Sequence, residues 1–133
     1  MRAEHEQQCI ALVAFNHLTQ EEDEAELLNA GVSKFTLMTG VFKGQEERSY
    51  MVDYEDLASL KDALARCNQE CVLYRDGQFH GYLLSKSDNY SRDWTAEGVK
   101  RQYVGKWREV DVTQLKNVES YTQYNGRYFA CRK

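Results

Sequence analysis

The stretch from Lys34 to Leu84 constrains the fold more than any other part of the chain. Its hydrophobic pattern moves between the two-residue repeat of strands and the longer repeat of helices. Phe35–Thr39 and Arg48–Val52 read as two strands, and the turn region between them contains Gly44-Gln45. We therefore expect these two segments to pair as a hairpin.

A helix and a second hairpin are expected next. Asp53 can cap the helix from its side-chain oxygen. The helical face carries apolar residues at spacings of three, four and three, namely Leu57, Leu60, Leu64 and Cys67. The segments Cys71–Tyr74 and Phe79–Leu84 then flank Asp76-Gly77, which is a two-residue hairpin signal. The whole stretch predicts strand, strand, helix, strand, strand.

The N-terminal part is interpreted as helical. Glu4–Leu18 favours a helix, although the short apolar run CIALVAF at 9–15 leaves a buried strand as an alternative. Thr19 and Glu22 have the spacing of a capping box and predict the start of a second helix. Gly31 is suited to end that helix, because glycine tolerates left-handed dihedral angles.

Beyond residue 84 the expected elements are shorter. Ser85–Gly98 is polar and is expected to form a surface excursion, and Val104–Val112 alternates well enough for a strand. Thr113–Val118 is expected to form one short helical turn. Asn125-Gly126 is the strongest hairpin signal in the chain.

These segments predict a single α+β domain over residues 1–133. The expected architecture is a mostly antiparallel sheet with N-terminal helices and one helix between two hairpins. We divide it into a helical part (1–31), the strand-strand-helix-strand-strand unit (34–84) and an aromatic-rich β extension (85–133). A chain of 133 residues can bury a core of its own as one domain.

Composition limits the setting of the protein. No apolar run approaches the roughly 18 residues that cross a bilayer, and the polar N-terminus is not a secretory signal. The four cysteines are too few and too scattered for a disulfide framework. We therefore expect a cytoplasmic protein that has no membrane association.

Few residues suggest chemistry. Cys67, Cys71 and His80 could contribute zinc ligands, but their spacing suits buried thiols better than a structural zinc site, so no metal and no cofactor are expected. No nucleophile arrangement and no phosphate-binding loop is recognisable. A polar pocket is one hypothesis, with four candidate residues: Glu47, Ser49, Gln69 and Tyr74.

The C-terminal half interleaves basic and aromatic side chains. Such residues occur at protein interfaces and in binders of single-stranded nucleic acid, and equally as cross-strand pairs within a sheet. The candidate interface residues are Trp94, Arg101, Tyr103, Trp107, Arg108, Tyr124 and Arg127.

Two motifs resemble small uncharacterised proteins of bacteriophages and prophages. They are GVFKGQEERSYMV at 40–52 and NQECVLYRDG at 68–77, and together they cover under half of the chain. The related pattern is a hairpin, a helix and an NQExVLY strand. Matching positions are Gly40, Phe42, Gly44, Glu47, Ser49, Tyr50, Val52, Asn68, Gln69, Glu70, Val72, Leu73 and Tyr74. The resemblance implies a phage-type gene expressed in the bacterial cytoplasm, and it supplies no catalytic residue.

The predicted function is that of a non-enzymatic phage-type accessory protein that binds and modulates a host or phage protein. It is based on the missing catalytic constellation, the aromatic-rich C-terminal half and the uneven charge, which is −8 over residues 1–71 and +4 over residues 72–133. An alternative is a single-stranded nucleic-acid-binding protein that uses the basic and aromatic C-terminal half. A second alternative is a small enzyme with a polar pocket near Glu47. The sequence does not indicate an oligomeric state.

Overall fold

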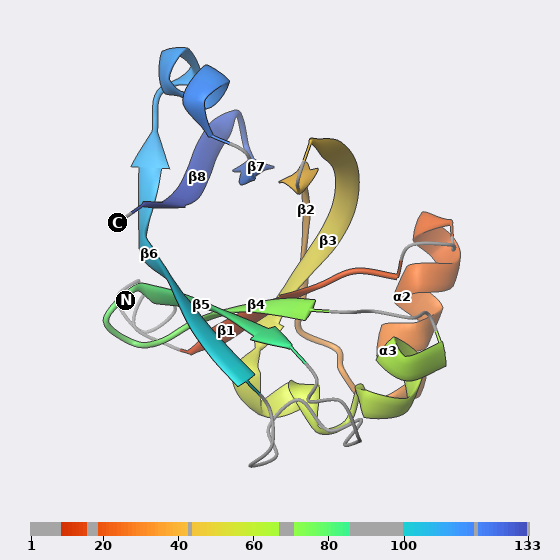
Figure 1. Cartoon of the computed structure of the whole chain (residues 1–133). Coiled ribbons are helices and arrows are strands. Elements are labelled where there is room, and N and C mark those ends of the chain that lie inside the picture. The colour runs from red at the N-terminus through yellow and green to blue at the C-terminus, as the bar shows by residue number, and fades with distance from the viewer. Residues whose placement is uncertain are drawn as a thin grey trace, which may run out of the picture.

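The computed structural model describes residues 9–15, 19–42, 44–66, 71–85, 100–118 and 120–132 (Figure 1). Within these residues the strands form a closed barrel in the order β1-β3-β2-β7-β8-β6-β5-β4, and every neighbouring pair is antiparallel. The strands are β1 (Ile10–Val13), β2 (Thr36–Phe42), β3 (Gln45–Asp53), β4 (Cys71–Arg75), β5 (His80–Ser85), β6 (Lys100–Val110), β7 (Tyr121–Tyr124) and β8 (Arg127–Arg132). The helical elements are α2 (Gln20–Asn29), α3 (Lys61–Arg66) and the 3-10 segments η1 (Tyr54–Leu57) and η2 (Val112–Asn117).

The predicted α+β class is wrong, because the described chain is mostly strand. Among the described N-terminal residues, α2 is the only helix, and residues 10–13 form β1 instead of a helix. Residues 4–8 and 16–18 of the predicted first helix lie outside the described residues. β1 lies between β3 and β4, where Leu12 is opposite both Met51 and Leu73. All four β1 residues are buried, and a short run that is apolar on both faces has no strand alternation to recognise. The strand alternative for residues 9–15 is therefore the one that the structure supports.

Pairings between distant segments close the barrel. β1 joins β3 to β4, β2 pairs with β7, and β6 pairs with β8. Closure gives each strand two neighbours and so satisfies backbone groups that an open sheet would leave at its edges.

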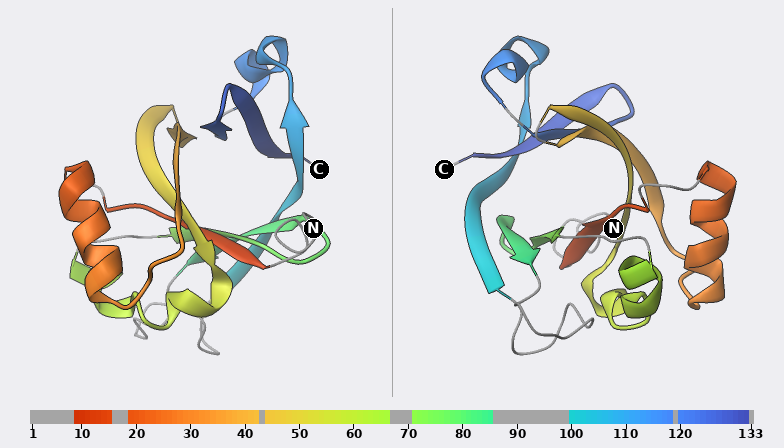
Figure 2. Two further views of the ribbon diagram at one scale, coloured as in Figure 1. Left: turned by 180° about the vertical axis from the view of Figure 1, so that it is seen from behind. Right: turned by 45° about the vertical axis from the view of Figure 1, so that its right-hand side comes forward.

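The second predicted helix is confirmed as α2, together with its capping box. The Thr19 hydroxyl accepts the Glu22 backbone N–H at 3.2 Å, and the Glu22 carboxylate accepts the Thr19 N–H at 3.2 Å. Figure 2 shows that α2 and α3 lie on one side of the barrel, outside the strands. α2 turns Leu27 into the core and leaves Leu28 58% exposed, so one face of this helix packs against the barrel.

The main core lies between the barrel and these helical elements. The predicted leucine face is buried, since Leu57, Leu60 and Leu64 are each 0% exposed. These leucines belong to one core cluster with side chains from several strands, from α2 and from the segment that follows β1. Its other members include Ala11, Val13, Phe15, Leu27, Tyr50, Val52, Val72 and Leu84. The predicted single helix is divided into η1 and α3, and Asp53 precedes η1 without a capping hydrogen bond from its side chain.

The two predicted tight turns differ in outcome. Asn125-Gly126 joins β7 to β8 with φ angles of 53° and 73°, as a two-residue hairpin of this type requires. The β4–β5 turn is longer than predicted and runs from Asp76 to Phe79. There the Asp76 carboxylate accepts the backbone N–H groups of Gln78 and His80, each at 2.9 Å, and Phe79 takes a φ of 66°.

No helix in the described part of the chain is both long enough and apolar enough to span a membrane.

Candidate functional site

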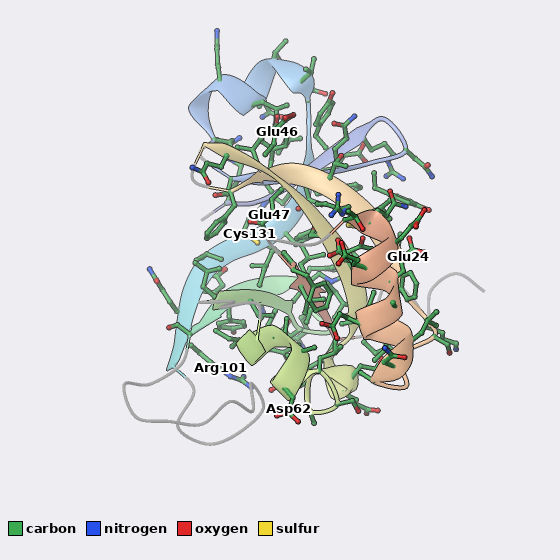
Figure 3. The ribbon with its side chains drawn as sticks, turned by 90° about the vertical axis from the view of Figure 1, so that its right-hand side faces the viewer. Glu24, Glu46, Glu47, Asp62, Arg101 and Cys131 are labelled. Carbon is green, nitrogen blue, oxygen red and sulfur yellow. The ribbon has the colours of Figure 1, made fainter. Side chains whose placement is uncertain are left out.

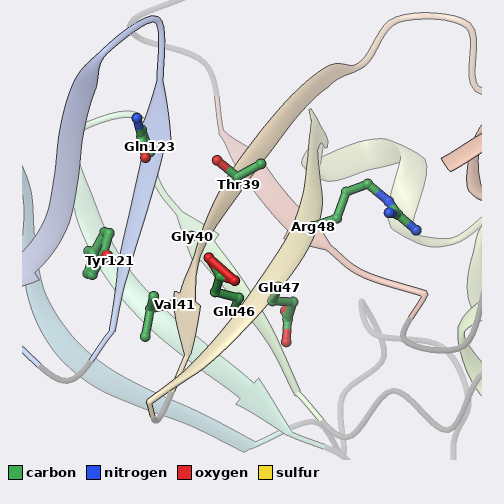
Figure 4. Close-up of a pocket in the computed structure, with 8 residues that line it drawn as sticks. All are labelled: Thr39, Gly40, Val41, Glu46, Glu47, Arg48, Tyr121 and Gln123. Atoms are coloured by element: carbon green, nitrogen blue, oxygen red, sulfur yellow. The ribbon is translucent and has the colours of Figure 1, made fainter. Parts of the chain in front are cut away.

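The candidate site is a cavity of about 250 Å³ where β2, β3 and β7 meet. Figure 4 shows the eight lining residues, which come from all three strands. They are Thr39, Gly40 and Val41 from β2, Glu46, Glu47 and Arg48 from β3, and Tyr121 and Gln123 from β7. The site therefore depends on the β2–β7 pairing that helps to close the barrel.

Gly40 allows these strands to come together at the cavity. It is paired with Glu47 on β3 and with Thr122 on β7. A Cβ atom at this position would overlap the Tyr121 carbonyl oxygen and would lie 3.0 Å from the Thr122 Cα. Because both obstacles are backbone atoms, a larger residue could fit only if the strands moved apart.

Two carboxylates give the cavity its charge. Glu46 is exposed and Glu47 is half-buried. Burial raises the pKa of the Glu47 carboxyl above its usual value. Within the described residues, no hydrogen bond or ion pair to the Glu47 carboxylate is present. Figure 3 shows both glutamates on the same half of the molecule, with Glu46 nearer the end of the β2–β3 hairpin. A cation is the ligand that would best compensate these charges.

Arg48 also borders the cavity, but its charge is already paired. Its Nε donates to the Asp23 carboxylate of α2 at 2.7 Å, and the Tyr50 hydroxyl donates to the same oxygen at 2.9 Å. Asp23 is 1% exposed. Hydrogen bonding to Asp23 raises the pKa of the Arg48 guanidinium, which stays protonated. The pKa of the Tyr50 hydroxyl is also raised, mainly by burial and to a smaller extent by its own hydrogen bond to Asp23.

The structure separates the four predicted pocket residues. Glu47 lines the cavity, and Ser49 lies two residues further along β3, where it is buried. Tyr74 is on β4 and is separated from β3 by β1. Its ring packs between Tyr54 at 4.4 Å and Tyr82 at 5.9 Å, so it belongs to another cluster. Gln69 lies outside the described residues.

Sequence reasoning missed most of the cavity. Tyr121 and Gln123 reach it because β7 pairs with β2 from about eighty positions away along the chain. Gly40 was noted as part of a motif, but its role in the strand approach was not recognised. A local pattern carries no signal for either feature.

The candidate interface residues that the structure describes belong to at least two groups of contacts. Arg101 lies 5.1 Å from the Tyr74 ring centroid and donates to the Tyr54 hydroxyl at 3.2 Å. Figure 3 shows it at the opposite end of the molecule from Glu46. Tyr103 continues the cross-strand row formed by Tyr74 and Tyr82.

The remaining interface candidates lie elsewhere on the barrel. Trp107 stacks on Phe129 with ring centroids 5.6 Å apart, and Arg127 is bound to Glu109 at 2.6 Å. Arg108 is exposed beside a second hollow, Tyr124 is 40% exposed at the β7–β8 hairpin, and Trp94 is outside the described residues. Arg127 also lies over the Phe129 ring, 5.4 Å from its centroid, so Trp107 and Arg127 belong to one group of contacts. The candidate interface itself is not tested by these contacts and stays a prediction.

The proposed zinc ligands do not gather in the described chain. There, no group of three or more His, Cys, Asp or Glu side chains is arranged to hold a metal ion. His80 lies 3.4 Å from Asp76 instead. Cys67 lies outside the described residues.

The comparisons with known proteins identify the family. A family model described as the S-adenosylmethionine lyase family matches residues 13–132, which run from the end of β1 to the end of β8. Among curated proteins, none matches this chain. The predicted non-enzymatic accessory role is wrong, because a lyase family is a family of enzymes, and the match gives no support to nucleic-acid binding. Since the match covers most of its length, the chain belongs to the S-adenosylmethionine lyase family.

Proposed function

We propose that this protein is an enzyme that cleaves S-adenosylmethionine at a carbon–sulfur bond without adding water. The family match over residues 13–132 is the observation that carries the proposal. We assign the reaction to the cavity between β2, β3 and β7. The two carboxylates there are suited to a substrate that has a permanently positive sulfonium and a positive ammonium group.

The size of the cavity suggests how the substrate is held. A volume of about 250 Å³ is slightly below the usual range of ligand pockets. We therefore expect it to enclose the methionine portion around the sulfur, while the adenosyl group lies over the rim. Tyr121 and Gln123 border the cavity and supply an aromatic face and an amide for further contacts.

The chemistry demands little of the protein, because the leaving group is a neutral thioether. In one route a carboxylate oxygen of the substrate attacks its own γ-carbon. A carbon–oxygen bond forms, the carbon–sulfur bond breaks, and its electron pair leaves with sulfur as 5′-methylthioadenosine, while the remainder becomes homoserine lactone. No proton moves in this route, so the protein has to position the chain and bind its charges.

The other lyase route is elimination. A base removes a proton from the β-carbon, a double bond forms to the γ-carbon, and the thioether leaves. Glu47 would then act as the base, and its raised pKa would suit that role. Both routes release 5′-methylthioadenosine, and the second product distinguishes them.

The test is to incubate the purified chain with S-adenosylmethionine in water enriched in oxygen-18 and to quench the reaction early. We expect 5′-methylthioadenosine together with a four-carbon product that contains no oxygen-18. Proton magnetic resonance separates the lactone from its alkene isomer. Intact substrate after long incubation with excess protein would reject the function. A first-formed product that contains solvent oxygen would indicate hydrolysis and would also reject it.

A further inference from the structure

The cavity has a second charged layer behind it. Asp23 is the buried acidic residue of α2, and its exposed fraction is 1%. One of its oxygens accepts both the Arg48 Nε, at 2.7 Å, and the Tyr50 hydroxyl, at 2.9 Å. A carboxylate that is buried in this way is costly unless it is paired, so the contact with Arg48 has to be kept in the folded protein.

The position of Arg48 makes this contact relevant to the cavity. Arg48 follows Glu47 directly on β3 and lies two residues from Glu46, which places Arg48 and Glu46 on the same face of the strand. An arginine on the same strand face as a glutamate two residues away could pair with that carboxylate. Figure 4 shows its side chain turned away from Gly40 and Glu46 instead, and the ion pair with Asp23 accounts for that direction.

The helix that supplies Asp23 is held firmly against the barrel. Leu27, one turn further along α2, is fully buried in the core, and the capping box at Thr19 fixes the start of the helix. Asp23 is therefore presented to β3 from a rigid element, and its position is set independently of any ligand in the cavity.

We propose that Asp23 is a positioning residue that makes the cavity selective for cations, because it holds Arg48 away from Glu46 and Glu47. The inference rests on the proposed function, since the sulfonium of S-adenosylmethionine is the cation that these carboxylates would receive. When the contact with Asp23 is lost, the Arg48 side chain turns toward the cavity. Its positive charge then offsets the negative charge of the carboxylates that line the cavity.

The test uses Asp23→Asn, which keeps the shape of the side chain and removes its charge, together with the double variant D23N/R48Q. Tyr50→Phe is the matched control, because it removes a hydrogen bond to the same Asp23 oxygen and leaves the ion pair. We expect D23N to weaken the binding of S-adenosylmethionine about tenfold, as for loss of one charge-assisted contact. The binding of neutral S-adenosylhomocysteine should change little. The double variant should bind S-adenosylmethionine more tightly than D23N does, because no arginine is then left to turn toward the cavity.

A second readout does not depend on the substrate. The Glu47 carboxyl is titrated by carbon-13 magnetic resonance in the same four proteins. In D23N its pKa should fall, because the positive charge of Arg48 then lies closer to the cavity that Glu47 lines, and in D23N/R48Q and Y50F it should stay at the wild-type value. An unchanged Glu47 titration in D23N would overturn the proposal, and so would a double variant that binds no better than D23N.

The outcomes keep the two proposals apart. A wild-type chain that leaves S-adenosylmethionine intact rejects the proposed function, whereas the Glu47 titration still decides the role of Asp23. If D23N does not fold, the double variant is compared with R48Q alone. Equal binding of S-adenosylmethionine by these two proteins supports the proposal, because Asp23 then acts only through Arg48, and weaker binding by the double variant overturns it.

Discussion

Gly40→Ala should open the barrel at the cavity. The added Cβ would overlap the Tyr121 carbonyl oxygen and come within 3.0 Å of the Thr122 Cα. Neither obstacle is the end of a flexible side chain, so β2 and β7 must separate. Three residue pairs join these strands, and Gly40–Thr122 is the middle one.

The size of the effect follows from two contributions. Overpacking a site that cannot adapt costs about 1–3 kcal/mol. Each β2–β7 hydrogen bond lost when the strands separate costs about 1 kcal/mol more. We therefore expect the free energy of unfolding to fall by about 2–4 kcal/mol, which for a chain of this size lowers the melting temperature by about 10 °C.

The assay is urea unfolding followed by circular dichroism, with Gly31→Ala as the control. Gly31 has a φ of +84° and nothing within 4 Å of the added Cβ, so this change costs about 1 kcal/mol of backbone strain without a collision. The loss for G40A should be at least twice that for G31A. Equal losses would refute the reasoning that Gly40 is required by the close approach of β7.

Three further predictions concern the core, the cavity and a thiol. Leu60→Ala should lower the free energy of unfolding by about 2–5 kcal/mol, because Leu60 is fully buried, and the exposed Leu28→Ala by under about 0.5 kcal/mol; similar losses in urea unfolding would contradict this. Burial raises the pKa of Glu47, so its carboxyl favours folding below about pH 4.5 and this contribution is lost as the pH rises through the raised pKa. The melting temperature of wild type relative to Glu47→Gln should therefore fall from pH 4 to pH 7, and a constant difference would refute the shift. Burial raises the pKa of the Cys131 thiol to about 11, so iodoacetamide at pH 8 should label it far more slowly in the folded chain than in urea, as measured by peptide mass spectrometry.

Local patterns predicted many elements but not their assembly. The Thr19–Glu22 capping box, the buried leucine face and the Asn125-Gly126 turn are encoded within a few residues of each other, and the structure has all three. β1 could not be assigned from its pattern, because its burial depends on β3 and β4, which lie far along the chain.

The candidate site shows the same limit more strongly. Glu47 was named from its motif, yet the residues around it come from β7, whose pairing with β2 has no local signal. Tyr74 was predicted for the same pocket, but strand order places it beyond β1 in an aromatic row. Barrel closure determines which distant side chains meet, and closure is a property of the whole set of strands.

The central claim is that the chain cleaves S-adenosylmethionine in the cavity that Glu47 borders. The most direct measurement compares the rate of 5′-methylthioadenosine release by wild type and by Glu47→Gln. The matched control is Glu24→Gln, because Glu24 is a half-buried glutamate of α2 that does not line the cavity. We predict turnover by wild type and E24Q, and a rate at least about a hundredfold lower for E47Q at a melting temperature no lower than that of the wild type at pH 7. Absence of turnover by the wild type, or equal rates for E47Q and E24Q, would contradict the claim.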